Sequence, residues 1–117
     1  MHPALSAELV LVEWAPPPTR PPLARALRWP PGLPPVRIVR VPSTIHDALP
    51  HAAKDGFPQF YAKNVGMRRS RGEFVLVTNG DVMLGQELVG LLARRSLDPA
   101  SFYRSLASPA LLSLSLS

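Results

Sequence analysis

The sequence predicts an α/β fold with a mainly parallel sheet of about three strands. One observation is that short apolar runs are typical of strands covered on both faces: Glu8 to Glu13, "ELVLVE", places four apolar residues between two acids. The other is the order of the segments, which is strand, loop, strand, helix, strand, helix. Buried strands that are linked through helices are normally parallel, so we expect a parallel sheet.

The composition indicates one small domain. The chain has 117 residues, 46% of them hydrophobic, and no cysteine, which excludes disulfides and thiolate metal sites. No apolar run approaches the roughly 18 to 20 residues of a membrane helix. The start, Met1-His2-Pro3, lacks the basic and then apolar pattern of a signal peptide. We therefore expect a soluble, cytoplasmic protein.

Prolines dominate the first third of the chain, and most of the fifteen fall between Pro16 and Pro42. The stretch "WAPPPTRPP" is predicted to be a loop, because proline lacks an N–H group and has a fixed φ. Leu23 to Arg28, "LARALR", is compatible with a short helical turn. Val36 to Val41, "VRIVRV", is β-rich and bounded by prolines, so it is predicted to be the second strand.

Gln59 to Arg69, "QFYAKNVGMRR", is predicted to be a helix. Its one unfavourable residue is Gly66, because glycine has a low helix propensity. Successive residues of a helix are about 100° apart, so one side carries Tyr61, Ala62, Val65 and Gly66. The small residues on this side permit a close approach to a sheet. Lys63 and Asn64 fall on the opposite side. The sequence therefore predicts that this polar pair faces away from the packing surface.

The second half of the chain is predicted to begin with a strand over Glu73 to Thr78. Leu84 to Arg95, "LGQELVGLLARR", repeats leucine at helical spacing and ends in two arginines, which the helix dipole favours at that end. It is predicted to be a helix. The final "SLASPALLSLSLS" is predicted to be a frayed, low-complexity tail, with an edge strand as the alternative.

Asn79-Gly80 is a strong hairpin signal, but a hairpin requires a second alternating strand. A helical period follows instead, so the segment is predicted to be a strand, a loop and a helix. In open α/β sheets, ligands bind beyond the carboxyl ends of the strands, and Asn79 and Asp81 lie at such an end. Asp81 is therefore a candidate functional residue, with a turn or helix cap as the alternative.

Three short motifs follow one another in "YAKNVGMRRSRGEFVLVTNGD": Lys63-Asn64-Val65-Gly66, Ser70-Arg71-Gly72-Glu73 and Asn79-Gly80-Asp81. This block resembles the donor half of the family 2, GT-A type glycosyltransferases. In that family an Arg/Lys-Asn-x-Gly helix leads through a short Gly-Glu turn into a strand that ends in an Asp-x-Asp motif. "AELVLVEW" is similar to the family's second strand, and Glu13 matches its terminal acid. The resemblance spans roughly residues 8 to 104.

The resemblance implies that Glu13, Lys63, Asn64 and Asn79 bind the nucleotide of a nucleotide-diphosphate sugar. It also implies that Asp81 holds Mg²⁺ or Mn²⁺ against the diphosphate. Asn79 stands where the motif has its first Asp, and a neutral amide contributes less to holding a metal. For Lys63 and Asn64, a solvated helix face is the alternative.

The resemblance further implies a partial GT-A, Rossmann-like three-layer unit over residues 1–104 and a Ser/Leu tail over residues 105–117. The family's first strand and its acceptor half, with the catalytic base, have no counterpart here. We therefore expect a glycosyltransferase-like fragment that binds the nucleotide sugar without turnover by this chain alone. No residue is assigned as catalytic. An uncovered sheet edge near Glu8 to Val12 is expected to promote association.

Two other function classes stay open. The net charge of +5 fits a small basic nucleic-acid-binding protein, although the aromatic residues are not interleaved with the arginines as a stacking platform needs. The cluster Arg68, Arg69 and Arg71 fits a solvated helix end as well. The P-x-x-P spacing in "PPPTRPP" fits a proline-rich scaffold. His46 and His51 lack a metal-binding spacing and are interpreted as surface residues.

Overall fold

A computed structural model describes residues 6–50, 56–106 and 113–116. The chain divides into two compact units, of which the first covers Ser6–Gly80 and the second Asp81–Ser117. His51 lies outside the described residues.

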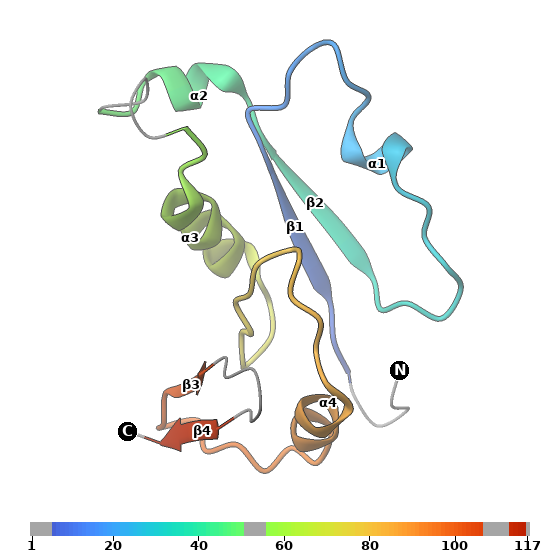
Figure 1. Ribbon diagram of the computed structural model, residues 1–117, viewed down its shortest axis with the longest axis vertical. Coiled ribbons are helices and arrows are strands. Elements are labelled where there is room, and N and C mark those ends of the chain that lie inside the picture. Colours follow the sequence, from blue (N-terminus) through green and yellow to red (C-terminus); the bar gives the residue numbers. More distant parts are fainter. Residues whose placement is uncertain (1–5, 51–55, 107–112, 117) are drawn as a thin grey trace. The chain divides into compact units, whose positions relative to one another are not determined.

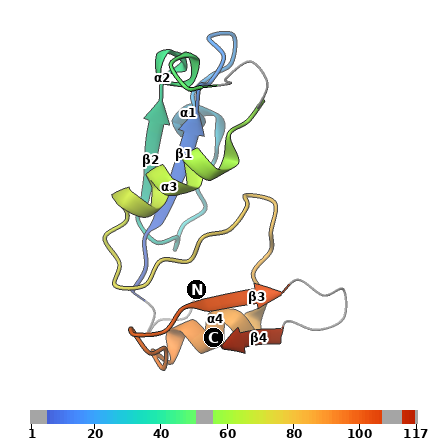
Figure 2. The same ribbon diagram turned by 90° about the vertical axis from the view of Figure 1, so that its left-hand side faces the viewer.

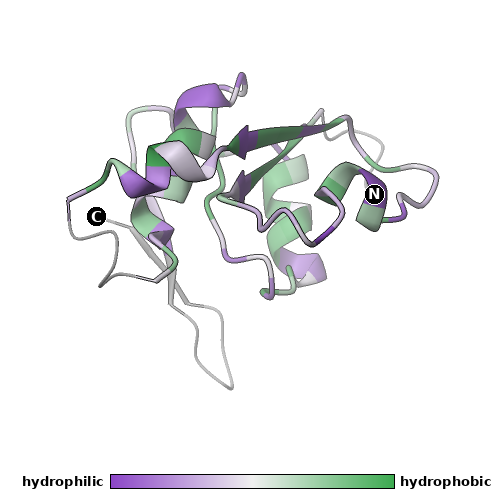
Figure 3. Cartoon of the chain, turned by 90° about the horizontal axis from the view of Figure 1, so that it is seen from above, coloured by the Kyte–Doolittle hydropathy of each residue, from purple (hydrophilic) through white to green (hydrophobic). Residues whose placement is uncertain are grey.

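The first unit is built on two parallel strands, β1 (Leu9–Trp14) and β2 (Val36–Val41). They are paired along their whole length, from Leu9 opposite Val36 to Trp14 opposite Val41, and they run side by side in Figure 1. Most of their residues are apolar (Figure 3). The sequence prediction of an α/β fold with parallel strands is confirmed for these two strands. The observed parallel sheet has two strands and not three.

The connection from β1 to β2 is mostly loop, with one short helix, α1 (Leu23–Ala26). Its first part closes into a turn in which the Arg20 N–H donates to the Pro17 carbonyl over 3.2 Å. The P-x-x-P spacing of Pro18 and Pro21 therefore overlaps a turn rather than an extended polyproline helix. After β2 comes the short helix α2 (Ser43–Asp47). Its last two residues, His46 and Asp47, belong to a segment that was expected to be irregular.

Helix α3 (Gln59–Arg69) has the bounds that the sequence predicts. It crosses one face of the sheet (Figure 2). Ala62 is buried, and a Cβ atom added at Gly66 would lie 3.3 Å from Val12 Cγ2, so the absence of a side chain permits the close approach. The predicted packing face is thus confirmed. Asn64, predicted to face away, is exposed, and Lys63 is partly buried.

The predicted third strand, Glu73 to Thr78, is wrong, because the structure has no strand there. Within the part of the chain that the structure describes, residues 71–84 make no backbone-to-backbone hydrogen bond. The side chains of Phe74 to Val77 stay between 41% and 49% exposed. Their β-branched and aromatic composition favours a strand, but a strand forms only where a neighbouring backbone completes the ladder.

The second unit contains α4 (Gln86–Ala93) and an antiparallel pair, β3 (Tyr103–Leu106) and β4 (Ser113–Leu116). The predicted helix is confirmed with shorter bounds. The Ser/Leu segment was predicted to fray, and its described part instead follows the edge-strand alternative.

A polar turn links α4 to β3. Asp98 accepts hydrogen bonds from the Ala100 N–H and the Ser101 hydroxyl, and its own N–H donates to the Tyr103 hydroxyl. The Ala100 N–H, followed by the Ser101 hydroxyl, lowers the pKa of Asp98.

The Glu8 carboxylate connects three segments of the first unit. It accepts from Arg37 Nε of β2 over 2.9 Å and from the Arg71 N–H, just after α3, over 2.7 Å. Arg37 also donates to the Arg69 carbonyl at the end of α3. The Arg71 N–H, and after it the Arg37 side chain, lower the pKa of Glu8. One carboxylate therefore holds the start of β1, the start of β2 and the end of α3 together.

The core is small. Among the described residues, the buried apolar side chains are Val41, Pro58 and Ala62 in the first unit and Ala93 in the second. Of the helices in the described ranges, none has the length and apolar composition that crossing a membrane requires.

Two glycines in helices provide a matched test of the packing of α3. Gly66→Leu is expected to destabilise the protein by about 1–3 kcal/mol, because the new side chain overlaps Val12. Gly90→Leu in α4 is expected to stabilise it by about 0.5–1 kcal/mol, because a Cβ at Gly90 meets nothing within 4 Å and leucine favours a helix. Urea denaturation measures both changes, and equal effects would contradict the packing of α3 on β1.

Glu8 makes the stability of the first unit dependent on pH. Its pKa is lowered in the folded protein, so its contribution is present above its ordinary value near 4.5 and is lost as the pH falls through the folded value. The free energy of unfolding of the parent is therefore expected to fall more steeply on acidification than that of Glu8→Gln. Urea titrations at several pH values give both slopes.

Glu73→Gln is the control for this experiment, because Glu73 is exposed and makes no polar contact within the described residues. It should keep the slope of the parent. Parallel slopes for the parent and Glu8→Gln would show that the Glu8 contacts do not persist in solution.

Candidate functional site

The carboxyl end of β1 carries an aromatic cluster. Because side chains alternate along a strand, Trp14 lies on the same face as Val12, which is the face that α3 covers. The Trp14 ring lies 6.5 Å from the ring of Tyr61, centre to centre, with an angle of 35° between the planes. Tyr61 belongs to the first turn of α3 and is 48% exposed. The two rings therefore form a partly open platform at the end of the strand.

His46 completes this cluster from α2. The Trp14 indole N–H donates to His46 Nδ1 over 3.1 Å, and the two rings meet edge to face with centres 6.4 Å apart. An imidazole nitrogen that accepts a hydrogen bond carries no proton, so in this arrangement any ring proton of a neutral His46 is on Nε2. His46, which the sequence analysis interpreted as a surface residue, is partly buried and fixes the orientation of the indole.

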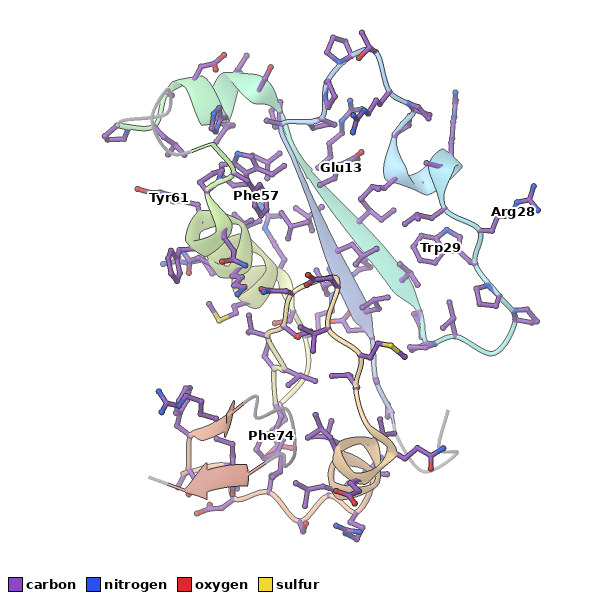
Figure 4. All side chains as sticks on the ribbon, in the orientation of Figure 1. Glu13, Arg28, Trp29, Phe57, Tyr61 and Phe74 are labelled. Carbon is purple, nitrogen blue, oxygen red and sulfur yellow. The ribbon has the colours of Figure 1, made fainter. Side chains whose placement is uncertain are left out.

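Glu13 lies on the other face of β1, as alternation requires. It is buried, with 8% of its surface exposed, and its Oε1 accepts from the Leu23 N–H at the start of α1 over 3.0 Å. Figure 4 shows Glu13 on the α1 side of the sheet and Tyr61 on the α3 side. The structure therefore does not bring Glu13 together with the predicted nucleotide-binding residues of α3.

Asn79 does meet α3. Its Oδ1 accepts from Gln59 Nε2 over 2.7 Å, and Gln59 is the first residue of the helix. Lys63 follows Gln59 by four residues, which puts both on one face of α3, one turn apart. The hydrogen bond to Gln59 therefore brings Asn79 to the first turn of α3, the end of the helix that also carries Tyr61.

The remaining predicted site residues are dispersed. Asn64 is exposed on α3, and Asp81 is exposed in a turn at the start of the second unit. No group of three histidine, cysteine, aspartate or glutamate side chains suited to a metal ion occurs among the described residues. The donor set of this part of the chain therefore does not fit a metal ion held by the protein alone.

Sequence reasoning missed Trp14, Tyr61, His46 and Gln59 as partners in one site. The available signal was the position of Trp14 directly after a buried strand, where ligands of α/β sheets bind. The other three are brought to that point only by the pairing of β1 with β2 and by the packing of α3.

No family model, no curated protein and no solved structure matches this chain.

The bond between Trp14 and His46 can be measured by a double-mutant cycle. Trp14→Phe removes the donor and keeps a ring, and His46→Phe removes the acceptor and keeps a ring. We expect a coupling free energy of about 0.5–1.5 kcal/mol from urea denaturation of the two single variants and the double variant. If the two single effects simply add, the bond contributes nothing to the fold.

Proposed function

We propose that the first unit binds a nucleotide-diphosphate sugar at the carboxyl end of β1, in the manner of the donor half of a GT-A type glycosyltransferase. The observation that carries this proposal is the Trp14 and Tyr61 platform at the carboxyl end of β1, with the Gln59 and Asn79 amide pair at the same end of α3 as Tyr61. The location agrees with the general placement of ligands beyond the carboxyl ends of parallel strands. The Rossmann-like character of the unit belongs to this proposal, whereas the observed parallel sheet has two strands.

The base is proposed to stack on Tyr61. Every nucleobase has a flat face that stacks on an aromatic ring, and such a contact contributes about 1–3 kcal/mol. The Trp14 ring lies beside Tyr61, and the hydrogen bond to His46 holds Trp14 in place. The partly exposed ring of Tyr61 is therefore already oriented before a ligand arrives.

The diphosphate is proposed to lie along the first two turns of α3. Lys63 supplies a positive charge for the phosphate oxygens. Gln59 and Asn79 keep donor groups available, since the bond between them uses only one Gln59 N–H and the Asn79 carbonyl oxygen. Amide groups of this kind bind phosphate or ribose hydroxyls without adding charge. Glu13 is not given a role in this binding, because it is buried toward α1.

A metal ion has no assigned step in this proposal, because the described residues do not supply a metal site. Mg²⁺ or Mn²⁺ at Asp81 stays a prediction from the family resemblance. It is tested separately, by the effect of Asp81→Ala on any Mn²⁺-dependent part of nucleotide binding.

Nucleic acid is the second candidate ligand, and one observation favours it. Most of the basic residues belong to the first unit, and two of the few acids there are engaged, Glu8 with Arg37 and Glu13 in the interior. A strongly basic unit attracts any polyanion. The two candidates differ in salt dependence, because neutralising many phosphates releases many counterions.

The nucleotide proposal is tested by titration calorimetry with UDP, GDP and ADP and their sugar conjugates. Tyr61→Ala is expected to weaken binding of the preferred nucleotide roughly 5- to 150-fold through loss of stacking. Phe60→Ala is the matched control, since Phe60 is the neighbouring aromatic residue of α3 and is 82% exposed. It should bind like the parent.

Two results would count against nucleotide binding. One is an absence of heat with every nucleotide, and the other is an equal loss in Tyr61→Ala and Phe60→Ala. A single-stranded oligonucleotide is titrated in parallel at two salt concentrations. Binding that falls steeply with salt, without any response to nucleotides, would favour nucleic acid instead.

A further inference from the structure

A second feature of the first unit is separate from the aromatic platform. It is the loop between α1 and β2, with the sequence Arg28-Trp29-Pro30-Pro31-Gly32-Leu33-Pro34. We propose that Arg28 to Pro34 is a docking segment for a polyproline-recognition domain of the SH3 type, one with an aromatic-lined groove and an acidic pocket at one end.

The backbone of this loop is restricted almost everywhere to the polyproline II region. A proline ring fixes its own φ near −65°, and it also confines the residue before it to extended conformations. One or both restrictions apply to each of Trp29, Pro30, Pro31, Leu33 and Pro34. Arg28 and Gly32 carry neither restriction, and Gly32 has φ +84°.

Gly32 is therefore the position at which the backbone of the proline-rich part can change conformation. Pro31 and Gly32 form a turn in the folded unit, and within the described residues no backbone-to-backbone hydrogen bond of good geometry closes it. Glycine populates negative φ about as readily as positive φ. Rotation of Gly32 to φ near −75°, with opening of this turn, makes the segment a continuous polyproline II helix.

In that helix, Arg28, Pro31 and Pro34 lie on one edge. Polyproline II has three residues per turn, so Arg28, Pro31 and Pro34 recur at the same angular position. Prolines at this spacing fit the pockets between aromatic rings of a recognition groove, and the arginine meets a carboxylate at the end of the groove. The orientation is fixed because the charge stands only at the N-terminal end of the segment.

The segment is accessible in the folded unit. Arg28 is exposed and makes no hydrogen bond or ion pair within the described residues. Figure 4 shows its side chain directed away from the loop, whereas Trp29 lies on the side toward β2. Leu33 is 43% exposed. The earlier proline stretch is less suited, because the bond from the Arg20 N–H to the Pro17 carbonyl holds it in a turn.

The proposal is tested with the full chain and a panel of purified SH3 domains that accept ligands beginning with arginine. Binding is measured by titration calorimetry. At least one domain is expected to bind, and Arg28→Ala should weaken that binding roughly tenfold or more through loss of a charge-assisted contact. Arg25→Ala is the matched control, an exposed arginine of α1 outside the motif, and it should bind like the parent.

Gly32→Pro tests the conformation that is bound. Proline fixes φ near −65° and removes the turn, so this variant should bind as tightly as the parent or more tightly. Weaker binding by Gly32→Pro would overturn the proposal, as would equal losses in Arg25→Ala and Arg28→Ala. Failure of every domain in the panel to bind the parent would overturn it as well. None of these outcomes depends on nucleotide binding.

Discussion

The first unit depends on the contacts of one carboxylate, that of Glu8. A two-stranded parallel sheet has few hydrogen bonds and no sharp turn to fix its register, because its strands are joined by a long connection. Glu8 stands just before β1 and binds Arg37, the second residue of β2, so the ion pair supports the register in which Leu9 faces Val36. Its bond to the Arg71 N–H then holds the end of α3 at the same end of the sheet.

Once that register is set, alternation along β1 decides which side chains can meet. Trp14 and Val12 share a face, so the close approach of α3 at Gly66 also brings Tyr61 to Trp14. Glu13 then necessarily points to the other face, where it satisfies the first N–H of α1. The same geometry that builds the aromatic platform therefore removes Glu13 from it. A family motif that is matched residue by residue does not contain this information.

The sequence predicted those parts of the fold that depend on local pattern. Both parallel strands and α3 were found within a residue of their expected bounds, since apolar runs and helical periodicity are properties of short segments. The third strand at Glu73 to Thr78 was wrong because strand formation requires a partner edge, which local composition does not supply. Trp14, His46 and Tyr61 come from three elements. Their contact depends on the pairing of the strands and the packing of the helices, which a local sequence pattern does not predict.

Because the core is small, binding of a ligand is expected to contribute to the stability of the first unit. Val41, Pro58 and Ala62 are the apolar side chains buried in the described part of the first unit, so burial alone connects its segments weakly. The proposed nucleotide site draws Trp14 from β1, Tyr61 from α3 and Asn79 from the loop that follows α3. A ligand that contacts all three restrains segments that the core leaves loosely joined. Because such a ligand binds the folded unit and not the unfolded chain, its binding free energy adds to the stability of the fold. The aromatic platform is therefore both the candidate binding surface and a point where a bound ligand would stabilise the unit.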